Sequence, residues 1–145
     1  MIIHLATDHT GVSHKEALKA YLVEQGIDVV DHGATEVVDG DDYPDYVLPC
    51  AQAVAADPDN SMGVIFGGSG QGEAMCANRA PGVRCALYYG GPTDILTLSR
   101  EHNAANILSL GARFVSEDES IKAVMLWLGT AFSNDERHVR RLSKF

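Results

Sequence analysis

The sequence has no long apolar run, few basic residues and only three cysteines. A membrane-spanning helix needs about 20 apolar residues, so neither a span nor a membrane partner is expected. Eleven basic residues stand against twenty acidic ones, a net charge of -9, which argues against binding nucleic acid. Cys50, Cys76 and Cys85 form no disulfide framework or metal spacing, which indicates a reducing compartment such as the cytoplasm.

Length and composition favour one folded domain over residues 1–145. Of the 145 residues, 46% are hydrophobic and 21% are charged, so the chain is neither disordered nor of low complexity. A chain of this length can form one hydrophobic core but is too short to form two. The first residues are expected to form a strand and not a signal peptide, because no basic residues precede the short apolar run.

Short β-rich runs alternate with longer runs of helical periodicity. Capping boxes are predicted at 13–16 and 133–136, and Gly26 is expected to end the first helix. This alternation predicts a parallel α/β sheet with helices on both faces and a site beyond the carboxyl ends of the strands. Strands are expected at 2–7, 27–30, 63–66, 84–88 and 107–110, and helices at 13–26, 43–56, 73–78, 93–102 and 118–132, with a last one from 133.

The strongest local motif is the glycine-rich stretch Gly-Gly-Ser-Gly-Gln-Gly-Glu at 67–73. Its glycines let successive N–H groups point into one concavity at the start of a helix, where an anion binds. No Lys-Ser/Thr follows, so the motif is not a P-loop. Glu73 is either a functional carboxylate or a residue that favours the helix start. Four glycines in six residues are costly to order, which favours the functional interpretation.

The last nine residues reverse the charge of the chain. Residues 1–136 hold seven basic and all twenty acidic residues, whereas the last nine hold four basic residues and no acidic one. Their spacing of i, i+3, i+4 and i+7 predicts one basic helical face, formed by Arg137, Arg140, Arg141 and Lys144. Such a face is either solvated or a clamp for an anion such as phosphate, which Arg binds in bidentate geometry.

Two histidines stand where proton transfer is plausible. His9 follows Asp8 at the end of the first expected strand, and His102 precedes Asn103 shortly before the fifth. Both histidines are expected near the loops at the carboxyl ends of the strands, where the site is predicted. Imidazole moves protons near neutral pH, although a lone histidine is more often structural. No histidine or cysteine spacing typical of a metal site occurs, so no metal is expected, and the cysteines are interpreted as inert.

Several short motifs follow one another along essentially the whole chain. They are Thr7-Asp8-His9-Thr10-Gly11, Asp42-Tyr43-Pro44, the 67–79 loop and helix, Pro81-Gly82-Val83-Arg84, Arg100-Glu101-His102-Asn103, Gly111-Ala112-Arg113 and the stretch from Arg137 to Arg141. In combination and order, these motifs resemble the ribose-5-phosphate isomerase B family, which includes galactose-6-phosphate isomerase subunits. The resemblance implies a flavodoxin-like or Rossmann-like five-stranded parallel sheet, and a homodimer or tetramer with sites at the subunit interface.

The resemblance also implies aldose–ketose isomerisation of a phosphosugar without metal or cofactor. One branch of the family opens the glycine loop with a cysteine base. Here that position is Gly67, so the chain matches the branch in which the glutamate, Glu73, is the base. Ring opening is assigned to His102 or His9, and Ser69 passes a proton between two oxygens. The implied substrate ligands are Asp8, Tyr43, Gly68, Gly70, Gly72, Asn103, Arg113, Arg137 and Arg141.

The expected reaction interconverts ribose 5-phosphate and ribulose 5-phosphate, within pentose phosphate metabolism or another sugar pathway. An isomerase of a six-carbon or rarer phosphosugar is the nearest alternative, because the stretch 88–98 is slightly longer than the family usually has. A phosphosugar sensor without catalysis is an alternative of another class, but a sensor has no use for a carboxylate base. A nucleotide-binding module is disfavoured because the Walker lysine is missing.

Overall fold

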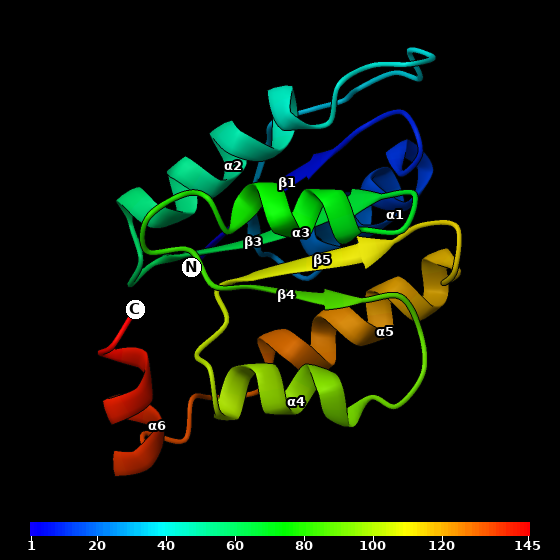
Figure 1. The fold of residues 1–145 in the computed structure, drawn as a ribbon. Helices are drawn as coiled ribbons and strands as arrows, with labels where there is room; N and C mark the ends of the chain where they lie inside the picture. Colours follow the sequence, from blue (N-terminus) through cyan, green and yellow to red (C-terminus); the bar gives the residue numbers. More distant parts are fainter.

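The computed structural model describes residues 1–145 and has a five-stranded sheet at its centre (Figure 1). The strand order is β2-β1-β3-β5-β4, and every neighbouring pair is parallel. This confirms the predicted flavodoxin-like parallel sheet, with β5 placed between β3 and β4. The strands are β1 (Ile2–Thr7), β2 (Asp28–Asp31), β3 (Ser61–Gly67), β4 (Cys85–Tyr88) and β5 (Ile107–Gly111).

Helices cover both faces of the sheet, as the alternating pattern predicts. On one face α1, α4 and α5 enclose a core that includes Leu5, Phe66 and Trp127. On the other face α2 and α3 enclose a second core that includes Ala6 and Ile65. Successive residues of β1 and β3 therefore pack on opposite faces. The helices are α1 (Val12–Glu24), α2 (Pro44–Ala56), α3 (Gln71–Ala77), α4 (Asp94–Glu101), α5 (Glu117–Leu128) and α6 (Glu136–Leu142).

Both predicted capping boxes are wrong. Helix α1 begins at Val12 after Gly11 and has no side-chain cap, because Ser13 donates to Glu117 and Glu16 accepts from Lys15 instead. Helix α6 begins after Asp135, also without a side-chain cap. The capping box that does form lies at the start of α5 and joins Ser116 to Glu119. At Ser13 a long-range partner thus replaces the local hydrogen bond that the motif predicts.

The strand order places three loops side by side. Because β1, β3 and β5 are neighbours, the residues that follow them meet at the carboxyl edge of the sheet. Figure 1 shows α6 and the C-terminus beyond the other ends of the strands, near their starts. We call these two ends the carboxyl edge and the amino edge. None of the helices is long and apolar enough to cross a bilayer.

Candidate active site

Glu73 lies at the centre of the carboxyl edge, in the first turn of α3. Its side chain is 5% exposed, and its carboxyl group fills the space above Gly67. A Cβ atom at residue 67 would lie 2.0 Å from Cδ of Glu73. Burial raises the pKa of Glu73, and the nearby Asp8 carboxylate raises it further, although its own backbone N–H acts in the opposite direction. A carboxylate with a raised pKa is a stronger base.

The close fit between Gly67 and Glu73 predicts that Gly67→Ala displaces the Glu73 carboxyl group without unfolding the protein. The new methyl group would displace only the end of a flexible side chain, so the fold should persist. A base displaced by about 1 Å costs roughly 10²-fold in rate. For the isomerisation of ribose 5-phosphate that the sequence resemblance implies, we expect a loss of that size in kcat and a melting temperature close to wild type.

The matched control is Gly129→Ala, at the end of α5, where φ is -75°. It should leave kcat unchanged. A Gly67→Ala enzyme with wild-type kcat would show that the carboxyl position of Glu73 does not matter for turnover.

The glycine loop presents free backbone donors next to Glu73. The N–H groups of Gly68, Ser69, Gly70 and Gly72 donate to no acceptor within the chain. Gly70 has φ +75°, and a Cβ there would lie 3.0 Å from the Leu110 carbonyl oxygen, so only glycine fits. Convergent N–H groups of this kind bind an anion or a developing oxyanion.

Arg113 and Tyr43 flank this loop. A Cβ atom on Gly68 would lie 3.3 Å from Cζ of Arg113, and one on Gly72 would lie 2.9 Å from the hydroxyl of Tyr43. The backbone N–H of Arg113 donates to Gly68 at 3.1 Å, which ties the end of β5 to the loop. The exposed guanidinium of Arg113 forms no ion pair with a carboxylate and is therefore free to bind an anion.

Asp8 and His9 complete the carboxyl edge. Asp8 is buried, and its Oδ1 accepts from the backbone N–H of Thr10 at 2.9 Å. His9 Nδ1 lies 2.6 Å from Oδ1 of Asp41. The sequence pattern does not single out Asp41, because a pairing across 32 positions leaves no local signal. This contact was the main site feature that the sequence did not reveal.

Asp8, His9 and Asp41 bring one possible metal-ligand atom each within 4.8 Å of one another. Hydrogen bonds already occupy these side chains, since Asp8 accepts from Thr10 and Asp41 accepts from His9. The protein's own contacts thus explain why the three groups lie together. The absence of a metal from the reaction stays a prediction.

The other four predicted site residues lie at the amino edge, far along the strands from Glu73 (Figure 1). His102 and Asn103 follow α4 and precede β5. The expectation that His102 lies near the loops at the carboxyl edge is wrong within one chain, because a helix between parallel strands must return the chain to the amino edge. Arg137 and Arg141 belong to α6, which lies at the same edge.

At the amino edge the His102 ring stacks on that of His138 in α6, with centroids 4.2 Å apart. His138 is buried and accepts from Nε of Arg137 at 3.2 Å. Burial lowers the pKa of His138, and the nearby His102 and Arg137 lower it further, so the ring is a neutral acceptor. Arg137, Arg140 and Arg141 are exposed. We call these three arginines, with His102 and Asn103, the amino-edge cluster.

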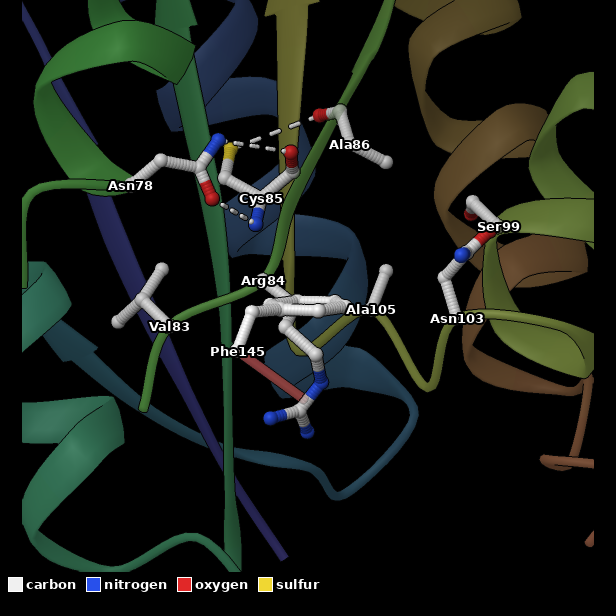
Figure 2. A pocket seen from close by; sticks show the side chains of 9 residues that line it. All are labelled: Asn78, Val83, Arg84, Cys85, Ala86, Ser99, Asn103, Ala105 and Phe145. Carbon is white, nitrogen blue, oxygen red and sulfur yellow. Dashed lines mark hydrogen bonds between the residues drawn. The ribbon is translucent and has the colours of Figure 1, made fainter. Parts of the chain in front are cut away.

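A cavity of about 450 Å³ lies along the outer side of β4, the edge strand of the sheet. Figure 2 shows Asn103 and the ring of Phe145 on its walls, and the Asn78 amide at the strand. Asn78 donates to and accepts from the backbone of Cys85, which satisfies part of the open strand edge. Asn103 is the one predicted site residue that lines this cavity.

The three cysteines are unpaired. Burial raises the pKa of the Cys50 thiol to about 12 and also raises the pKa values of Cys76 and Cys85. A thiol with a raised pKa is a weak nucleophile at neutral pH. This agrees with the interpretation of all three as inert.

Residues 3–145 match the family model described as Ribose/Galactose Isomerase. The probable ribose-5-phosphate isomerase B of Mycoplasma pneumoniae is 41% identical over 142 residues, 98% of this chain and 91% of that protein. Ribose-5-phosphate isomerase B of Mycobacterium tuberculosis is 37% identical over 98% of this chain and 86% of that protein.

Among solved structures, ribose-5-phosphate isomerase B from Mycoplasma genitalium with bound ribulose-5-phosphate has a TM-score of 0.93 at 36% identity. The match covers 99% of this chain and 92% of that one. In sequence, fold and nearly full length, the chain therefore belongs to the ribose/galactose isomerase family, alongside the ribose-5-phosphate isomerases B.

Proposed function

We propose that the protein interconverts ribose 5-phosphate and ribulose 5-phosphate. The observation that best supports this reaction is the buried carboxylate of Glu73 beside four unpaired N–H donors. Proton transfer between adjacent carbons needs a base and a group that stabilises the enediolate oxygen. A sensor would gain nothing from a buried carboxylate next to an anionic ligand, because the two charges repel.

In the proposed mechanism the open-chain sugar phosphate binds with its carbonyl oxygen on the glycine loop. Glu73 removes the proton from the carbon next to the carbonyl, which gives a cis-enediolate. The hydroxyl of Ser69 passes a proton between the two enediolate oxygens, and Glu73 returns its proton to the neighbouring carbon. The sugar hydroxyls bind to Asp8 and Tyr43, and the phosphate binds to Arg113 and His9.

We infer that a second copy of the chain completes each site. His102, Asn103, Arg137 and Arg141 would act on the Glu73 of the partner, where His102 opens the ring and the arginines bind the phosphate. The exposed position of α6 at the amino edge supports this arrangement. A two-fold axis would build two equivalent sites.

Exposed apolar side chains support a homodimer, which could pair further into a tetramer. Met75, Tyr89, Leu98 and Phe114 are exposed on α3, on α4 and at the carboxyl edge, and surfaces of this kind favour association. A cytoplasmic location is supported by the three unpaired cysteines. The reaction is proposed to need neither a metal nor a cofactor.

A six-carbon phosphosugar is the second candidate substrate. Tyr89 stands at the end of β4, and a Cβ atom on Gly111 would lie 2.8 Å from its Cβ. The Tyr89 ring packs on Phe114, with centroids 5.8 Å apart. The long stretch 88–98 therefore begins beside the glycine loop, where it can set the length of sugar that fits.

The test is an isomerisation assay with ribose 5-phosphate beside a panel of five- and six-carbon aldose and ketose phosphates, with and without a chelator. We expect turnover of ribose 5-phosphate that the chelator does not reduce. Turnover of another sugar alone would keep the reaction type and assign specificity to the stretch 88–98. Binding without turnover of any sugar would favour the sensor.

A further inference from the structure

A buried carboxylate outside the glycine loop holds the imidazole of His9. We propose that Asp41 is a positioning residue, which fixes His9 through Nδ1 and keeps the ring cationic so that Nε2–H binds the substrate phosphate. The proposal rests on the proposed function, because it assigns to Asp41 a part in binding the phosphosugar.

The contact between the two side chains is geometrically specific. Oδ1 of Asp41 lies 2.6 Å from Nδ1 of His9 and accepts the His9 backbone N–H at 3.1 Å. One carboxylate oxygen thus fixes both the ring and the backbone of residue 9. A carboxylate only accepts hydrogen bonds, so the ring must carry its proton on Nδ1. The His9 side chain is 25% exposed, which leaves the far side of the ring accessible at the carboxyl edge.

Burial makes this pairing strong. The Asp41 side chain is 7% exposed, and its Oδ2 is buried without a hydrogen-bond partner. A buried carboxylate with an unpaired oxygen is costly unless a cation lies beside it. His9 is the group that supplies this charge, because no lysine or arginine forms an ion pair with Asp41.

The charges around His9 all favour the protonated ring. The Asp41 hydrogen bond raises the pKa of His9 above its ordinary value. Burial lowers this pKa in part, and the carboxylates of Asp8, Asp41 and Asp39 raise it further. Burial alone would raise the pKa of Asp41. The hydrogen bonds and the charge of His9, with a smaller contribution from the Tyr46 hydroxyl that faces Asp41 from α2, outweigh burial and lower that pKa. The pairing therefore favours an imidazolium beside a carboxylate, and the Nε2–H of that ring can donate a charge-assisted bond to phosphate.

Asp41 is the residue to change, because Asp8 is engaged elsewhere. Oδ1 of Asp8 accepts from the backbone and the hydroxyl of Thr10, and Asp8 borders Glu73. Asp41→Asn removes one charge and keeps an oxygen that can still accept from His9. The fold should persist, since the change removes a buried charge.

The experiment compares wild type, Asp41→Asn, His9→Gln and the double variant with ribose 5-phosphate across pH. We expect Asp41→Asn to raise KM about tenfold, with kcat much less affected. In Asp41→Asn, KM should begin to rise at a pH about one unit lower than in wild type. In the His9→Gln background Asp41→Asn should have no further effect, because Asp41 acts through His9. Glu36→Gln, an exposed carboxylate of the same loop, is the matched control and should behave as wild type.

Histidine NMR provides a readout that does not depend on turnover. In wild type, His9 should carry its proton on Nδ1 at every pH and should titrate above an ordinary histidine, whereas Asp41→Asn should lower that midpoint. An unchanged His9 midpoint in Asp41→Asn, or an equal rise of KM in the His9→Gln background, would overturn the proposal. Failure of the proposed function looks different, since wild type would then turn over none of the sugars while the His9 titration still responded to Asp41→Asn.

Discussion

Glu73→Gln is expected to lower kcat for ribose 5-phosphate by about 10²- to 10⁴-fold, the usual contribution of a general base. Glutamine keeps the shape of the side chain that packs over Gly67 but cannot take a proton. Binding should persist or tighten, because the variant loses a negative charge that repels the sugar phosphate. Steady-state kinetics would measure the rate, and calorimetry with ribose 5-phosphate would measure the affinity.

The matched control is Glu24→Gln, an exposed carboxylate at the end of α1, which should retain wild-type kinetics. Loss of binding together with turnover in Glu73→Gln would instead assign Glu73 to substrate binding or to the helix start. A variant with full turnover would remove Glu73 from the mechanism.

The pH dependence of the stability of Glu73→Gln, compared with that of wild type, tests whether burial raises the pKa of Glu73. Because its pKa is raised in the folded state, the folded protein binds more protons than the unfolded chain between the ordinary and the raised pKa. The free energy of unfolding of wild type therefore falls as pH rises through that window. Glutamine does not titrate. At pH values above the raised pKa, Glu73→Gln should therefore have a higher melting temperature than wild type, and below the ordinary pKa of glutamate this difference should disappear. A variant that melts lower at pH 8 would contradict the desolvation of Glu73.

Mixing two inactive variants is expected to restore activity if each site combines residues of two chains. Glu73→Gln removes the base and His102→Asn removes the proposed ring-opening group, so each homodimer should be nearly inactive. A heterodimer contains one site with both changes and one site with neither. Random pairing after joint refolding makes half of the dimers mixed, so about a quarter of wild-type activity should return.

The control for this experiment is the double variant Glu73→Gln/His102→Asn mixed with wild type. A heterodimer of these two chains has one changed residue in each of its two sites, so both sites should be inactive. With random pairing, half of the wild-type chains are in such heterodimers and lose their activity. Absence of any recovery in the first mixture would show that Glu73 and His102 act within one chain or that they do not cooperate. Full activity of His102→Asn alone would exclude this histidine from ring opening.

The sequence by itself determined the features that depend on neighbouring residues. Alternation of apolar runs predicted all five strands, and β1 has the predicted bounds, because burial on both faces of a parallel sheet selects continuous apolar residues. The glycine motif predicted the loop with unpaired N–H groups, since its backbone turns require glycine locally. The order of strands was not readable, because pairing joins residues far apart in the chain.

Only the tertiary structure decided which of the predicted site residues lie together. The helix α4 returns the chain to the amino edge, and this separates His102 from Glu73 within one chain. Lys15 of α1 is fully buried, although lysine is usually exposed, and its Nζ lies 2.6 Å from Oδ2 of Asp31. Asp41 reaches His9 across 32 positions. Such contacts depend on how elements pack in space, and residue spacing along the chain does not encode that packing.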